Sequence, residues 1–166
     1  AQHLSTTNTF TLTVLEVNLP PTLAALADQQ VNPGEVVGFT AVAGDPDLPA
    51  NTLTFALLSA PSDATLDPAS GAFTWRPGIA AASTTNTIRL RVTDGGVPAL
   101  GAEQECRVIV LPLAEVRLTP LLAAPDRFVF EMTGQPGPDY AVEVGTNLAL
   151  PDWETVLTTN LTAAST

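Results

Sequence analysis

Apolar and polar positions alternate along most of the chain with the two-residue period of β-strands. In one such run Ile88, Leu90 and Val92 alternate with Arg89 and Arg91, so the apolar side chains share one face. No stretch places apolar residues at helical spacing, and 15 prolines and 11 glycines divide the sequence into short segments. Runs with this pattern occupy residues 9–17, 36–43, 52–58, 64–66, 72–75, 88–92 and 106–110. The pattern predicts an all-β chain.

Two pairs of these runs are expected to form hairpins. Between 64–66 and 72–75, Pro68 suits the second position of a type I turn and Gly71 supplies the positive φ that closes a tight hairpin. Residues 88–92 and 106–110 are joined by a longer connection, 94–102, which would place Arg91 opposite Glu105. We therefore expect one tight and one long hairpin within residues 18–112.

The strand pattern is interrupted at two places that predict domain boundaries. Asn18-Leu19-Pro20-Pro21 stops the first run, because proline lacks the amide donor that a ladder needs. After Pro112 the pattern restarts at 115–119, 127–133, 140–145 and 153–158, which is too few strands for an independent sandwich of ordinary size. We therefore predict tandem β-sandwiches, with a complete module at 18–112 and a partial second module at 113–166.

Residues 1–17 have two interpretations. They are either the last strand of a preceding module in a longer array, or a donor strand that completes the unfinished unit of another copy. In both cases an apolar strand face and an open sheet edge need partners.

Composition and charge limit the kinds of partner that the chain can bind. The formal net charge is −11, there is no lysine, and the six arginines are scattered, so binding to nucleic acid or to anionic lipid is not expected. No run approaches the roughly 20 apolar residues that cross a bilayer. Cys106 is the only cysteine and is expected to be a small buried side chain without a disulfide partner in the chain.

Residues 18–112 resemble the cadherin-like and immunoglobulin-like (He-PIG type) modules of large bacterial surface proteins. The matching elements are Asn18 to Pro21, Pro33 to Glu35, Gly44-Asp45-Pro46-Asp47, Leu53 to Phe55, Asp67 to Pro77 and Val92 to Pro98. Residues 126–158, with Thr133 to Tyr140 and Asn147 to Trp153, are similar to part of a second β-sandwich repeat found in secreted proteins of Verrucomicrobia-like bacteria.

The cadherin resemblance implies a calcium site at the junction with a preceding module. By position, Asp45, Asp47 and Asp94 match its downstream ligands, and Glu16 and Asn18 match the linker. Oxygen ligands of this kind suit a hard cation. The chain departs from the pattern where Leu19 and Pro20 replace an acidic and an amide linker position. The alternative is that the three aspartates accept hydrogen bonds from backbone amides in their own loops.

No catalytic constellation can be assembled from the sequence, since His3 is the only histidine. Trp75, Trp153 and Tyr140 are interpreted as core residues, with an aromatic sugar-binding platform as the alternative. We expect a non-enzymatic structural or adhesion segment of an extracellular bacterial surface protein or fibre. Its partners would be neighbouring modules, other copies of itself or surface glycans. The alternatives are a carbohydrate-binding accessory module of a secreted hydrolase and a fibre subunit joined by strand exchange.

Overall fold

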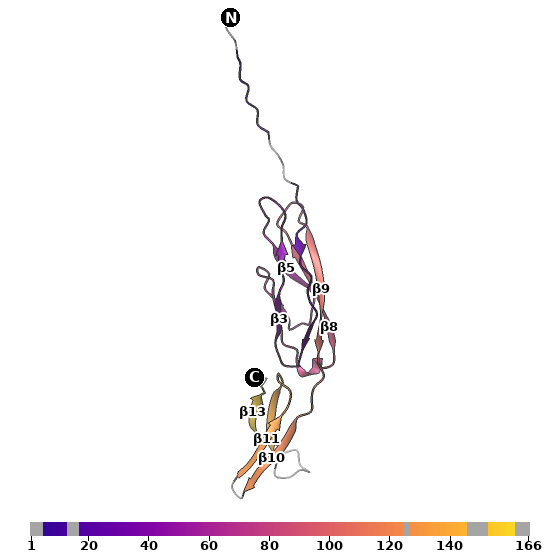
Figure 1. Ribbon diagram of the computed structural model, residues 1–166, viewed down its shortest axis with the longest axis vertical. Coiled ribbons are helices and arrows are strands. Elements are labelled where there is room, and N and C mark those ends of the chain that lie inside the picture. The colour runs from indigo at the N-terminus through magenta and orange to yellow at the C-terminus, as the bar shows by residue number, and fades with distance from the viewer. Residues whose placement is uncertain (1–4, 13–16, 125–126, 146–152, 162–166) are drawn as a thin grey trace.

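The computed structural model describes residues 5–12, 17–124, 127–145 and 153–161. Its regular structure consists of β-strands and one 3-10 turn, η1 (Ile79–Ala81), which confirms the all-β fold class. The molecule is elongated, with a β-sandwich in the middle, a second β unit beyond one pole, and residues 5–12 extending away from the opposite pole (Figure 1).

Two main sheets build the sandwich. One has the order β2-β9-β8-β5 and the other has the order β3-β7-β6, while β1 and β4 form a separate pair. The strands are β1 (Thr22–Leu23), β2 (Gln29–Val31), β3 (Val37–Thr40), β4 (Ala43–Gly44), β5 (Thr54–Ser59), β6 (Thr65–Leu66), β7 (Ala72–Trp75), β8 (Thr85–Thr93) and β9 (Gly101–Val110). All described pairings within the sandwich are antiparallel except that of β2 with β9.

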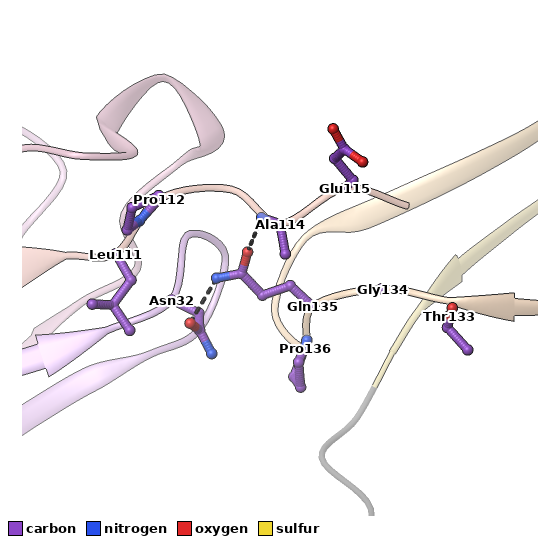
Figure 2. Close-up of a pocket in the computed structure, with 9 residues that line it drawn as sticks. All are labelled: Asn32, Leu111, Pro112, Ala114, Glu115, Thr133, Gly134, Gln135 and Pro136. Atoms are coloured by element: carbon purple, nitrogen blue, oxygen red, sulfur yellow. Dashed lines mark hydrogen bonds between the residues drawn. The ribbon is translucent and has the colours of Figure 1, made fainter. Parts of the chain in front are cut away.

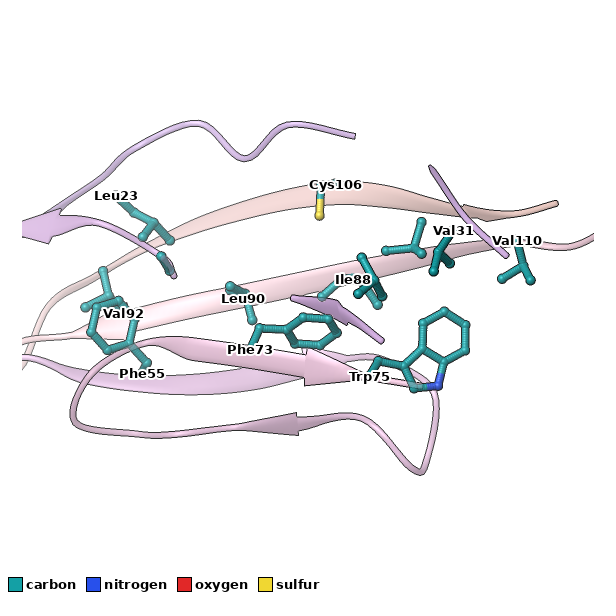
Figure 3. Close-up of a cluster of buried hydrophobic side chains, with 13 residues drawn as sticks. Leu23, Val31, Phe55, Phe73, Trp75, Ile88, Leu90, Val92, Cys106 and Val110 are labelled. Atoms are coloured by element: carbon teal, nitrogen blue, oxygen red, sulfur yellow. The ribbon is translucent and has the colours of Figure 1, made fainter. Parts of the chain in front are cut away.

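The core lies between these sheets and follows the predicted alternation. Ile88, Leu90 and Val92 of β8 are fully buried and face Phe73 and Trp75 of β7 in the opposite sheet (Figure 3). On β9 the buried face carries Cys106, Val108 and Val110. Burial raises the pKa of the Cys106 thiol, as does the nearby negative charge of Asp28. The expected role of this cysteine as a small core residue is confirmed.

The tight hairpin between β6 and β7 is also confirmed. Asp67 N donates to Ala72 O and Gly71 N donates to Asp67 O, both at 2.9 Å. Gly71 has φ +71°, a conformation that L side chains rarely adopt. The Asp67 side chain accepts hydrogen bonds from Ser70 and Ala69, which fixes the turn.

The predicted register of the long hairpin is wrong by two residues. Arg89 lies opposite Glu105 and Arg91 lies opposite Glu103. The pairing is set by the loop between β8 and β9, which closes when Asp94 N donates to Leu100 O at 3.0 Å. Arg89 and Glu103 form an exposed ion pair at 2.7 Å, a diagonal contact across the two strands.

Three short segments differ from the expected strands. The strands β1 and β2 were not foreseen, because two or three residues with mixed polarity give no periodic signal. Conversely, the part of residues 9–17 that the structure describes is not strand. Phe10 is 89% exposed and Leu12 is 78% exposed, so among the described residues nothing apolar packs against these side chains, and no strand is paired with this segment.

The second unit consists of two hairpins. They pair β10 (Arg117–Ala124) with β11 (Arg127–Thr133), and β12 (Asp139–Val144) with β13 (Glu154–Asn160). All four predicted strands exist, although β10 runs further than expected by accommodating Pro120 next to an irregularity in its register. Among residues of this unit whose burial is described, the buried ones are Gln135, Gly137 and Pro138, all next to the sandwich.

Candidate functional site

A cluster of Asn and Asp side chains closes the end of the sandwich where residues 17–19 enter it. We call this cluster the N-terminal pole; it comprises Asn18, Leu19, Asp45, Asp47, Asn51, Asp94 and Pro98. The pole brings the chain entering the sandwich against two loops, 45–51 before β5 and 94–100 after β8.

Asn18 connects the incoming chain to both loops. Its Nδ2 donates to Asp94 Oδ2 at 3.1 Å and to the carbonyl of Pro98 at 2.8 Å. Its Oδ1 accepts a hydrogen bond from Asn51 Nδ2 at 2.9 Å. One linker side chain thus uses both ends of its amide to hold the chain in place.

Asp47 receives donors from outside its own turn. It is 4% exposed, and Leu19 N donates to both of its carboxylate oxygens at 3.1 and 3.2 Å. Asn51 Nδ2 adds a hydrogen bond to Asp47 Oδ2 at 2.9 Å. A buried carboxylate requires such partners, because an unpaired one would carry a large desolvation cost.

Asp45 and Asp94 each accept two backbone amides of their own loop. Asp45 Oδ1 receives Asp47 N and Asn51 N, and Asp94 Oδ1 receives Gly96 N and Leu100 N. Burial by itself would raise the pKa of Asp94, but hydrogen bonds from Leu100, Gly96 and Asn18 outweigh it and hold that pKa below the ordinary value of 3.8. Asp45 and Asp94 thus accept backbone amides of their own loops, as the alternative describes, and calcium binding at these residues stays a prediction.

The structure brings together four of the five residues that the cadherin resemblance implied. Asn18, Asp45, Asp47 and Asp94 meet at the N-terminal pole, whereas Glu16, like His3, lies outside the described residues. Within the described ranges, no group of three or more His, Cys, Asp or Glu residues is placed to hold a metal ion. Asn51, which makes two of the side-chain bonds at the pole, was not singled out from the sequence.

A second set of contacts joins the sandwich to the second unit. We call it the C-terminal joint; it comprises residues 32–35, 76–77, Ala114, 134–139 and Asn160. Gln135 is 9% exposed at its centre, where Oε1 accepts Ala114 N at 2.8 Å and Nε2 donates to Asn32 Oδ1 at 2.6 Å (Figure 2). Tyr140 Oη donates to the carbonyl of Gln135 at 2.7 Å, which secures the loop from the other side.

Arg76 completes the C-terminal joint from the sandwich side. Its Nε donates to Gly34 O at 2.5 Å, and its Nη2 donates to Gly137 O and to Asp139 Oδ1, each at 3.3 Å. The Asn160 side chain donates to Asp139 at 3.0 Å. The hydrogen bond from Asn160 has the larger effect and the positive charge of the Arg76 guanidinium the smaller one, and together they hold the pKa of Asp139 below 3.8.

Acidification is expected to weaken both ends of the sandwich. Asp94 and Asp139 have folded-state pKa values below 3.8, so their contribution to stability is present above that value and is lost as the pH falls through the lower folded-state values. We expect the melting temperature to fall as the pH is lowered below about 4. Circular dichroism melts of the wild type and of Asp94→Asn test this; a variant with an unchanged pH dependence would contradict the role given to Asp94.

The aromatic residues do not form a common platform. Trp75 is buried, as predicted, and its Nε1 donates to Asp63 Oδ1 at 2.9 Å. Tyr140, next to the C-terminal joint, is half-buried. The prediction of burial is wrong for Trp153, which is 47% exposed on the second unit. A flat sugar-binding surface made by these residues together is therefore contradicted.

Comparisons with known proteins identify no family and no curated relative, but they find similar solved structures. No family model matches the chain, and no curated protein matches it. Mouse cadherin-23 EC22-24 is 18% identical over 70% of this chain and 44% of that chain, with a TM-score of 0.48. Protocadherin gamma B2 extracellular cadherin domains 3-6 are 19% identical over 66% of this chain and 29% of that chain, with a TM-score of 0.48.

A third similar structure is not a cadherin. It is a nucleoside hydrolase-related hypothetical protein from Saccharophagus degradans associated with carbohydrate metabolism, 19% identical over 56% of this chain, with a TM-score of 0.47. The chain spans 26% of that protein, and it spans less than half of each of the two cadherin structures as well. Separately, none of the described residues form a helix long and apolar enough to cross a membrane.

Proposed function

We propose that residues 18–112 are a non-catalytic structural connector in an extracellular array of β-modules, with residues 113–166 belonging to the next module. The observation that supports this best is the position of the two ends of the sandwich. The chain enters at the N-terminal pole and leaves at the opposite end through Leu111 and Pro112 (Figure 1). Because the chain enters and leaves at opposite ends, such a module would hold its two neighbours apart and would carry a pulling force along its long axis.

Side-chain contacts at both ends support the connector role. At the N-terminal pole, Asn18 and Leu19 are bound to the loops 45–51 and 94–100. At the C-terminal joint, Gln135 and Arg76 bind across the two units. Location at a bacterial cell surface and a role in adhesion are proposed from the sequence resemblance.

Calcium at the N-terminal pole stays a prediction, and the described arrangement does not fit it well. The carboxylate and amide oxygens are of the right chemical kind. However, apart from Asp45 Oδ2, which is buried and has no hydrogen-bond partner, every carboxylate oxygen of Asp45, Asp47 and Asp94 already accepts an N–H. Calcium takes six to eight oxygen ligands, whereas among the three carboxylates only Asp45 Oδ2, Asp47 Oδ1 and Asp94 Oδ2 keep a lone pair that no N–H occupies.

The connector role predicts an elongated monomer that does not need residues 1–17. Small-angle scattering and sedimentation velocity should give the same oligomeric state for the full chain and for a chain lacking those residues. A compact particle would contradict the proposal. Head-to-tail polymers that disappear on deletion would instead establish strand exchange, in which Phe10 and Leu12 of one copy would cover the second unit of another.

A further inference from the structure

We propose that the N-terminal pole is closed by the side-chain amide of Asn51 in place of a cation, so that the direction in which the chain enters the sandwich is fixed without calcium. The amide closure holds whether or not the sandwich serves as a connector.

Asn51 lies where two oxygens from different segments converge. Its Nδ2 donates to Asn18 Oδ1 and to Asp47 Oδ2, both at 2.9 Å. Its backbone N–H donates to Asp45 Oδ1 at 3.0 Å. One residue thereby joins the incoming chain to both aspartates of the Asp45-Pro46-Asp47 turn. An amide has two N–H donors and can bridge two acceptors, which a cation would otherwise do by coordination.

The other N–H donors at the pole also face carboxylate oxygens, which supports the proposal. Asn18 Nδ2 faces Asp94 Oδ2, and Leu19 N faces both oxygens of Asp47. A cation bound to these oxygens would lie against N–H groups whose positive ends point toward it, and would be repelled by them. These neutral donors stabilise the carboxylates of Asp47 and Asp94, each 4% exposed, whereas Asp45 Oδ2 is buried without a hydrogen-bond partner and is the oxygen at the pole most open to a cation.

The packing of Gly96 makes the closure testable. A Cβ on Gly96 would lie 1.9 Å from Asn18 Oδ1 and 2.1 Å from its Cγ, so any side chain there would displace the Asn18 amide. Gly95, the preceding residue, offers a matched control, because a Cβ there would approach Thr52 O no closer than 3.6 Å. The two positions differ in their approach to Asn18 while belonging to the same loop.

The C-terminal joint also depends on a side-chain amide. The amide of Gln135 bridges Asn32 Oδ1 and Ala114 N with one donor and one acceptor, as the Asn18 amide does at the N-terminal pole. Amides therefore hold the chain at both ends of the sandwich.

The experiment compares thermal unfolding of the full chain in millimolar calcium and in EDTA, for the wild type, Asn51→Ala, Gly96→Ala and Gly95→Ala. We expect the wild-type midpoint to be the same in both buffers. Asn51→Ala and Gly96→Ala should lower it by several degrees in both, while Gly95→Ala should match the wild type.

Two results would overturn the proposal. The first is a wild-type midpoint that rises with calcium and loses this response in Asp45→Ala, which would show that a cation closes the pole. The second is wild-type stability in Asn51→Ala and Gly96→Ala, which would show that the amides carry no part of the closure.

Discussion

Replacing Gly34 by alanine is expected to release the second unit from the sandwich while leaving the sandwich folded. Gly34 has φ +82°, where an L side chain costs about 1 to 2 kcal/mol. A Cβ there would also lie 2.2 Å from Gly137 O and 2.8 Å from Pro138 N. Because these are backbone atoms, no change of rotamer can relieve the overlap, so the backbone of one unit must shift away from the other and we expect the contact to open.

The Gly34→Ala substitution should have a large effect on the second unit, because the C-terminal joint anchors this unit to the sandwich. The residues known to be buried in it are Gln135, Gly137 and Pro138, so losing the joint removes its most protected part. Hydrogen exchange should show faster exchange of residues 134–144 in Gly34→Ala, with unchanged protection of β8 and β9. Gly78→Ala is the control, since a Cβ on Gly78 meets nothing within 4 Å. Unchanged exchange in Gly34→Ala would refute the anchoring.

The core could be predicted from the sequence because alternation decides which side chains share a face. Ile88, Leu90 and Val92 lie where the pattern placed them. Their register against β9 could not be predicted, since it depends on how Asp94 closes a long loop through its side chain and its backbone. The alternation of apolar and polar residues can be read within a single strand, whereas the register between two strands of a hairpin depends on the geometry of the loop that joins them.

The N-terminal pole shows the same limit. The resemblance to cadherin-like modules, and not the strand pattern, implied that Asn18, Asp45, Asp47 and Asp94 would lie together. It did not indicate that Asn51 would bridge them, since a single Asn after a proline-containing loop has many local uses. Gln135 was overlooked for a related reason: between Gly134 and Pro136 it resembles an exposed turn residue, and its burial depends on a contact with Asn32, 103 residues away.

The two tryptophans are expected to differ sharply when each is replaced by alanine. Trp75 is 3% exposed and packs near Val31, Val110 and Ile88 (Figure 3), so Trp75→Ala should cost about 3 to 5 kcal/mol of unfolding free energy. It would also leave Asp63 without its indole donor. Trp153, 47% exposed, should cost about 1 kcal/mol or less.

Both tryptophans alternate with polar neighbours in the sequence, so the contrast isolates what a second sheet contributes. β7 is covered by the sheet that contains β8. Trp153 directly precedes β13, which belongs to a two-stranded sheet. The adjacent residues Val156 and Leu157 of β13 are both about half exposed although they point to opposite faces. Urea unfolding followed by circular dichroism would measure the two costs. A cost for Trp153→Ala close to that for Trp75→Ala would show that the second unit has an apolar cover in solution, from another copy of the chain or from its own remaining segments.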